Sequence, residues 1–242
     1  MAPTRVSRGH RIPSGRRWRH AGAGVLATVE RMPDRPTDHE GRVRHWEGVY
    51  ERNAVDAVSW YQAEPAVSLA LIEALGVPRS APVVDVGGGA SMLVDRLIGS
   101  GFTDVTVVDV AERALAAARA RVGDDPRVDW IAADLFTWEP DRTYGLWHDR
   151  AVLHFAAGAE VDAYRAVLER AVGPGGAVIL GTFGPDGPEY CSGLPVTRYD
   201  AAGLAALLGD GFEVVEERTE AHRTPSGATQ SFVWLAARRT AA

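Results

Sequence analysis

Asp85-Val86-Gly87-Gly88-Gly89-Ala90-Ser91 is the stretch on which the fold prediction depends. It follows an apolar run at 82–86 and leads into a helical pattern at 91–99. Glycines between a strand and a helix permit a sharp bend and let a ligand approach the free N–H groups at the helix start. The stretch therefore predicts a nucleotide-like ligand, and a second signal is needed to define it.

Asp109 supplies that second signal, because it closes the next apolar run 22 residues after Gly87. A carboxylate at this place is suited to accept hydrogen bonds from two ribose hydroxyls. The dinucleotide fingerprint also requires a glycine where this chain has Met92, which disfavours a pyrophosphate ligand.

The remaining apolar runs and helical patterns alternate along the chain, which is typical of a parallel sheet covered on both faces. Strands are predicted at 82–86, 104–109, 127–131, 144–149, 176–183, 212–218 and 229–237, and helices at 66–76, 91–99, 111–122, 159–171 and 200–208. No helical pattern separates the last two strands. We therefore predict an α/β protein with a Rossmann-like, doubly wound seven-stranded sheet, mostly parallel, that ends in an antiparallel hairpin.

Composition excludes several classes of function. The chain of 242 residues has one cysteine and no lysine, so all 26 basic residues are arginine. Schiff-base chemistry and lysine-bearing phosphate loops are thereby excluded, and we predict a cytoplasmic protein with no metal site. No apolar run is long enough for a membrane helix. The oligomeric state, monomer or homodimer, stays open.

Charge divides the chain unevenly. Residues 1–45 carry ten arginines and four acids, a net charge of +6, so the rest carries 16 − 28 = −12. We interpret 1–31 as a disordered basic arm or non-native leader, with an organelle transit peptide as the alternative. Residues 32–80 are predicted to form an N-terminal lid and helix, and 81–242 the cofactor-binding domain. The acidic body argues against a nucleic-acid partner.

Asp85-x-Gly87-x-Gly89, Asp109 and Ala133-Asp134-Leu135 resemble the cofactor motifs of class I S-adenosylmethionine-dependent methyltransferases. The resemblance covers about residues 46–237. It implies that Asp85 organises the methionyl ammonium, Asp109 the ribose and Asp134 the adenine amino group. The full cofactor-binding set that we predict is Asp85, Gly87, Gly88, Gly89, Asp109, Val110, Asp134, Leu135, Arg150, Trp60 and Tyr61.

Polar and aromatic residues gather at the end of the fourth strand, in Trp147-His148-Asp149-Arg150, and continue to His154. This segment resembles the W-D-R-x-x-L stretch of thiopurine-methyltransferase-like members, which implies a wall of the site. Methyl transfer requires the nucleophile to be oriented and deprotonated. We predict His148 and His154 as candidate bases and Asp149 as their orienting group.

Substrate contacts are predicted from two aromatic openings and two loops. His45-Trp46…Tyr50 and Ser59-Trp60-Tyr61-Gln62 lack the spacing of a buried helix face and would form a lid over the sulfonium. Long loops at 184–195 and 222–227 carry Cys191 and His222. The predicted substrate-binding residues are Trp46, Tyr50, Gln62, Cys191 and His222.

The favoured function is an S-adenosylmethionine-dependent methyltransferase acting on an O, N or S atom of a small molecule. A protein methyltransferase of the lysine type is the alternative, because the acidic body would attract basic partners. Two other classes remain: a non-catalytic nucleotide-cofactor-binding protein and an NAD-dependent oxidoreductase.

Overall fold

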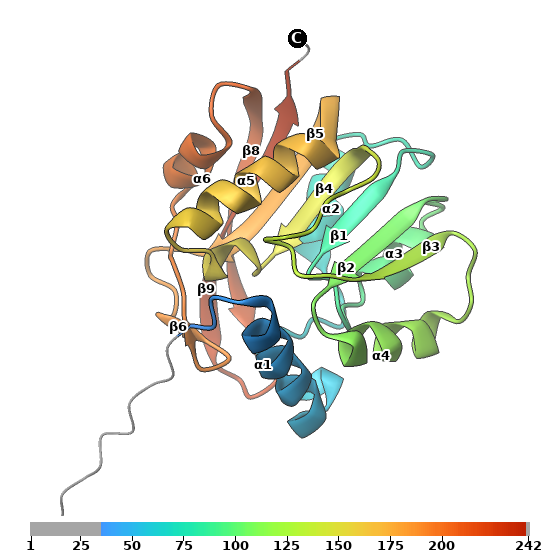
Figure 1. The fold of residues 1–242 in the computed structure, drawn as a ribbon. Coiled ribbons are helices and arrows are strands. Elements are labelled where there is room, and N and C mark those ends of the chain that lie inside the picture. Colours follow the sequence, from blue (N-terminus) through green and yellow to red (C-terminus); the bar gives the residue numbers. More distant parts are fainter. Residues whose placement is uncertain (1–34, 241–242) are drawn as a thin grey trace, which may run out of the picture. The chain divides into compact units, whose positions relative to one another are not determined.

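A computed structural model describes residues 35–240, and the predicted arm at 1–31 lies outside that range (Figure 1). Seven strands form one sheet in the order β3-β2-β1-β4-β5-β9-β8. They are β1 (Val83–Val86), β2 (Val105–Asp109), β3 (Val128–Ala132), β4 (Tyr144–Arg150), β5 (Val172–Phe183), β8 (Phe212–Arg223) and β9 (Thr229–Arg239). The first five strands run parallel, and β9 pairs antiparallel with both β5 and β8. The predicted sheet and its terminal hairpin are confirmed.

Helices cover both faces of this sheet, as the alternation of strands and helices predicts (Figure 1). On one face α2 (Ala66–Ala74), α3 (Leu93–Gly99) and α4 (Glu112–Val122) bury side chains such as Leu71, Leu97 and Leu115. On the other face α5 (Ala159–Ala171) and α6 (Ala201–Leu208) bury Leu168 and Leu204. The core is therefore divided by the sheet into two layers.

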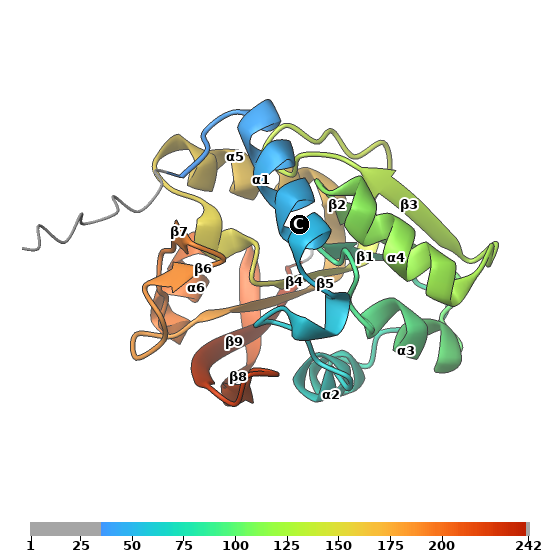
Figure 2. The ribbon, with the colours of Figure 1, turned by 90° about the horizontal axis from the view of Figure 1, so that it is seen from below.

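Helix α1 (His39–Arg52) is the main element that the sequence patterns do not predict. Its N-cap Asp38 accepts a hydrogen bond from the Gly41 amide at 2.7 Å, which starts the helix. Of its residues only Val49 is fully buried, so the helix has no broad apolar stripe to reveal it in the sequence. The helix lies across the carboxyl ends of the central strands (Figure 2). The segment 45–50 is therefore helical, although it lacks the spacing of a buried helix face.

Both predicted loops are shorter than expected. A small hairpin of β6 (Tyr190–Cys191) and β7 (Leu194–Pro195) folds the loop after β5. Strand β8 continues through His222 to Arg223, so that histidine lies in the sheet rather than in the turn. The single-turn helices η1 (Val55–Ala57) and η2 (Leu153–Phe155) complete the described elements. No helix within residues 35–240 has the length and apolar character needed to span a membrane.

Candidate functional site

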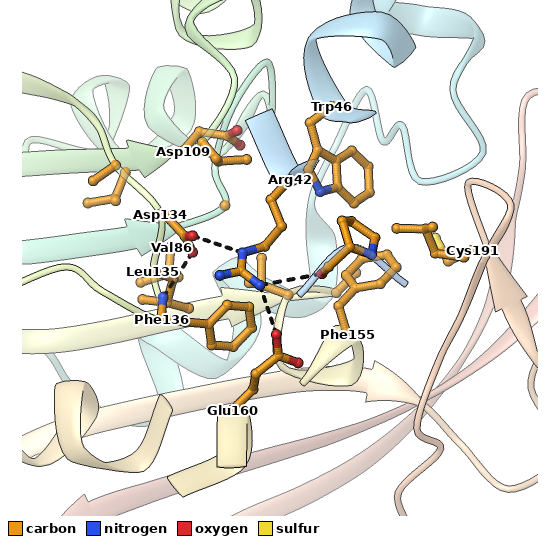
Figure 3. Close-up of a pocket in the computed structure, with 18 of the residues that line it drawn as sticks. Arg42, Trp46, Val86, Asp109, Asp134, Leu135, Phe136, Phe155, Glu160 and Cys191 are labelled. Atoms are coloured by element: carbon orange, nitrogen blue, oxygen red, sulfur yellow. Dashed lines mark hydrogen bonds and ion pairs between the residues drawn. The ribbon is translucent and has the colours of Figure 1, made fainter. Parts of the chain in front are cut away.

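A cavity with an empty volume of about 910 Å³, open to solvent, lies at the carboxyl edge of the sheet (Figure 3). Its walls come from the ends of β1, β2 and β4, from α1 and from the β6–β7 hairpin. Parallel strands bring their carboxyl ends to one edge, where α/β proteins bind ligands. The predicted residues Gly87, Asp109, Val110, Asp134 and Leu135 all line this cavity.

Two glycines of the turn after β1 are required by its backbone. Gly87 has φ +63°, and a Cβ there would lie 2.0 Å from Val152 Cγ2. Gly89 has φ +41°, and a Cβ there would lie 2.6 Å from Asp109 Oδ2. Side chains at these positions would both strain the backbone and fill space beside the cavity. The Ser91 Oγ accepts from the Leu93 amide at 3.1 Å and helps to start α3.

Asp109 is buried at the end of β2, where its Oδ1 accepts a hydrogen bond from the Ala111 amide at 2.8 Å. Burial raises the pKa of this carboxyl to about 7, and the hydrogen bond from Ala111 opposes the rise. The carboxylate faces the cavity beside the glycine turn. It is thus placed to accept hydrogen bonds from a bound ligand, and below about pH 7 it must first release its own proton.

A second cavity, of about 560 Å³, shares the walls Tyr50, Trp60, Val86, Gly87 and Arg150 with the first. Asp85 and Gly88 also line it. Among the residues that the structure describes, Asp85 Oδ2 has no hydrogen-bond partner, and neither do Arg150 Nε and Nη2. Buried polar atoms without partners are costly, so the unpaired carboxylate oxygen and guanidinium nitrogens beside one cavity favour a ligand that carries both charges.

Asp134 lines the larger cavity where helix α1 covers it (Figure 3). Arg42 of α1 donates from Nε to Asp134 Oδ2 and from Nη1 to Glu160 Oε1, each at 2.8 Å. Its guanidinium carbon lies 5.0 Å from the centre of the Phe136 ring. The Asp134 carboxylate is therefore held against the lid helix, with its Oδ1 also accepting from the Phe136 amide at 3.1 Å.

The three residues predicted as catalytic do not line the larger cavity. His148 faces α2, where Nδ1 bonds Asp85 Oδ1 at 2.8 Å and Nε2 bonds Ser68 Oγ at 2.9 Å. Successive strand residues point to opposite faces, so Asp149 faces α5 and accepts from the Tyr164 hydroxyl at 2.7 Å. Asp149 therefore orients neither histidine.

His154 lies in η2 and is fully buried between Phe155 and Phe183, with ring centroids 4.5 and 4.8 Å away. Neither ring nitrogen has a hydrogen-bond partner among the described residues. Burial, and to a lesser degree Arg150 and Arg35, lowers the pKa of His154 to about 3. The imidazole is therefore neutral and shielded at physiological pH.

The variant His154→Leu is expected to become more stable relative to the wild type as pH falls. The unfolded chain protonates this histidine below about pH 6.5 whereas the folded chain does not, so the wild type loses about 1.4 kcal/mol per pH unit from this group. Buried Asp109 and Asp149, whose pKa values are raised, act in the opposite direction in both proteins and cancel in the comparison. Urea unfolding at pH 7.5, 6.0 and 5.0 measures the difference, and a constant difference would contradict the assigned environment.

Aromatic residues predicted for the lid do come together. Trp46 of α1 contacts Trp60 and Phe155 edge to face, with centroid separations of 5.8 and 5.1 Å. Trp60 also accepts through its carbonyl from Arg150 Nη1 at 2.8 Å. Tyr50 lines both cavities, and burial followed by the charge of Asp109 raises its pKa well above the ordinary value.

The other predicted substrate contacts divide between cavities. Cys191 is buried in the wall of the larger cavity, and burial raises the pKa of its thiol to about 12. Gln62 lines the smaller cavity beside Tyr61, a predicted cofactor residue, and the Gln62 amide donates to Glu220 at 2.7 Å. His222 bonds the Ser59 carbonyl at 2.8 Å and lines a separate surface hollow. The chain does not bring His222 to the main site.

Arg42 and Glu160 are site residues that the sequence patterns miss. Arg42, Trp46 and Tyr50 are spaced by four residues and all line the larger cavity, which is the mark of one helix face. That spacing is visible in the sequence once Arg42 is counted with the aromatic residues. Glu160 leaves no comparable signal, because only the packing of α5 against α1 brings it there.

Fold and cavities together define a Rossmann-like protein with a glycine turn after β1, a buried acid at the end of β2, and unpaired carboxylate and guanidinium atoms at a second cavity. The sequence profile of the "Methyltransferase domain" family matches residues 83–176. This match and the shared fold bear out the predicted resemblance to class I S-adenosylmethionine-dependent methyltransferases and the predicted cofactor.

Solved structures share this fold. The N-methyltransferase NodS from Bradyrhizobium japonicum, in complex with S-adenosylhomocysteine, is 15% identical, covers 80% of this chain and 97% of its own, and has a TM-score of 0.61. The 1,6-didemethyltoxoflavin-N1-methyltransferase of Burkholderia thailandensis is 23% identical over 84% and 86%, with a TM-score of 0.60. Magnesium protoporphyrin IX methyltransferase from Synechocystis is 17% identical over 86% of each chain, with a TM-score of 0.57. No curated protein sequence matches the chain.

Proposed function

We propose that this protein transfers a methyl group from S-adenosylmethionine to an O, N or S atom of a small molecule. The observation that carries the proposal is a set of polar atoms without hydrogen-bond partners among the described residues. They are Asp85 Oδ2 and the Nε and Nη2 atoms of Arg150, and both residues line the smaller cavity. The amino-acid end of the cofactor is a zwitterion, so its ammonium suits the carboxylate and its carboxylate suits the guanidinium edge.

The remaining cofactor contacts follow from the walls shared by the two cavities. Gly87 and Gly88 leave room for the methionine chain, and Asp109 would accept from the ribose hydroxyls. Asp134 and Leu135 would hold the adenine, with Arg42 as the lid contact above them. Trp60 and Tyr61 would border the sulfonium, whose charge is attracted to aromatic faces. The bound cofactor supplies an electrophilic methyl group.

We favour a small acceptor over a protein side chain because the wall opposite the adenine end is built of buried or half-buried rings. Trp46 of the lid helix α1 contacts both Trp60 and Phe155 there. Such a wall suits an apolar molecule that enters the cavity. We do not retain His148, Asp149 or His154 as proton acceptors. His148 lines the smaller cavity but has both ring nitrogens bonded, to Asp85 and Ser68, while Asp149 and His154 line neither cavity.

Titration calorimetry with S-adenosylmethionine, S-adenosylhomocysteine and NAD tests the proposal. We expect binding of the first two and none of NAD, because Met92 replaces the glycine of the dinucleotide fingerprint. Binding of NAD, or of no ligand, would overturn the proposed function. Methyl transfer itself is then followed as the release of S-adenosylhomocysteine with candidate acceptors.

A further inference from the structure

The larger cavity separates its acids from its aromatic wall (Figure 3). Asp109 and Asp134 lie at the adenosine end, and Arg42 bridges Asp134 to Glu160. Trp46, Phe155 and Cys191 lie on the other side. The acceptor therefore meets rings and a thiol rather than carboxylates.

The three acids that line the cavity, Asp109, Asp134 and Glu160, each have another partner. Arg42 and the Phe136 amide bond Asp134. Glu160 accepts from Arg42 through Oε1 and from the Ala157 amide through Oε2 at 3.2 Å. Asp109 is assigned to the ribose in the proposed function. All three acids therefore have partners other than an acceptor at the aromatic wall.

The other titratable groups that face the cavity are proton donors near neutral pH. Arg35, Arg42 and Arg150 are cations. Burial raises the pKa of both Tyr50 and Cys191, so each keeps its proton. Within residues 35–240 the acceptor side of this cavity thus contains no group suited to act as a general base.

We infer that the acceptor is an apolar, ring-bearing molecule whose attacking atom is already unprotonated in solution, a thiolate sulfur or a neutral ring nitrogen. This inference rests on the proposed function and narrows its acceptor. The attacking atom supplies both electrons of the new bond to the methyl carbon, and the electron pair of the broken carbon–sulfur bond stays on the cofactor sulfur. A thiolate becomes a neutral thioether and a ring nitrogen becomes a cation, so no proton passes to the protein. Alcohols and alkylammonium groups do not meet this requirement.

The test uses the full chain at saturating S-adenosylmethionine, so that the titration of Asp109 in the free protein does not affect the measured rates. Thiophenol, benzyl mercaptan and isoquinoline are compared with benzyl alcohol and benzylamine, and S-adenosylhomocysteine formation is measured. Turnover with at least one member of the first group is expected to exceed that with either control by at least about 100-fold, the usual effect of a general base.

The pH dependence gives a second readout. With the two thiols the rate is expected to rise about tenfold per pH unit up to the pKa of the thiol itself, so the break in the profile moves with the acceptor. Faster turnover of benzyl alcohol or benzylamine, or a break at one pH for both thiols, would overturn the inference. So would the absence of enzymatic turnover with all of the first group.

A histidine base supplied from outside residues 35–240 is tested in the full chain with the double variant His10→Ala, His20→Ala. Unchanged turnover is expected, and its loss would overturn the inference. Binding of S-adenosylhomocysteine is measured in parallel. If it binds and the acceptor panel fails, only the acceptor inference falls, whereas failure to bind removes the proposed function itself.

Discussion

Replacing Asp109 with alanine is expected to lower the affinity for S-adenosylhomocysteine by at least about 100-fold, because two hydrogen bonds to a charged acceptor contribute roughly 3 kcal/mol or more together. The fold is expected to persist, since the lost carboxyl is buried and bonds only the Ala111 amide among the hydrogen bonds of the described residues. Titration calorimetry measures the affinity, and thermal unfolding measures the stability.

Two controls define what Asp109 does. Asp95→Ala removes an equal charge from α3, where Asp95 pairs with Arg121 outside both cavities, and should leave the affinity unchanged. Asp109→Asn keeps the volume but not the charge, and should bind more weakly than the wild type. Wild-type affinity in Asp109→Ala would remove the ribose assignment.

The raised pKa of Asp109 also predicts how cofactor binding depends on pH. Because the free carboxyl has a pKa of about 7, it is ionised above that pH and must release a proton on binding below it. The affinity should therefore be full above pH 7 and fall by up to about tenfold per pH unit as the pH decreases. This slope should disappear in Asp109→Asn, and its persistence there would assign the proton to another group.

Replacing Arg150 with methionine is expected to change stability and binding in opposite directions. Arg150 is half-buried, loss of solvent contact lowers its pKa to about 10, and its buried Nε and Nη2 have no partner among the described residues. Removing such a charge should leave the free protein as stable or more stable. Loss of the partner for the cofactor carboxylate should weaken S-adenosylhomocysteine binding by about 2 kcal/mol or more, roughly 30-fold.

The ligand 5′-methylthioadenosine tests which end of the cofactor Arg150 binds, because it lacks the amino-acid end. Its affinity should be the same in wild type and Arg150→Met, so the loss is confined to ligands with the carboxylate. Arg79→Met is the matched control: its guanidinium lies 4.6 Å from the Phe102 ring, as that of Arg150 lies 4.6 Å from Phe232, but Arg79 is outside both cavities. Equal weakening of both ligands by Arg150→Met would show that the guanidinium acts on the adenosine end instead.

Most of the fold could be predicted because its signals are local. Alternating apolar runs and helical patterns locate the strands of the seven-stranded sheet and the helices α2 to α6, with boundaries that differ by a few residues. The antiparallel pairing of β8 and β9 follows from the lack of a helix between them. Helix α1 is not predicted by these patterns, because it is held by a few contacts at the cavity rather than by a broad apolar face.

The cofactor side of the site was predictable for the same reason. Gly87, Gly89 and Asp109 each stand at the carboxyl end of a predicted strand, and parallel strands bring those ends together. The sequence by itself therefore determines the sheet, the glycine turn and the acid beside it.

Only the tertiary structure decides which side chains face the cavity. His148 and Asp149 are neighbours in the chain, yet the alternation of β4 sends them to opposite faces, where Asp85 and Tyr164 engage them. Arg42 reaches Asp134 across 92 residues of sequence because α1 folds over the sheet edge. The direction of a side chain and the partner it finds depend on the packing of distant elements, and neither composition nor spacing records that packing.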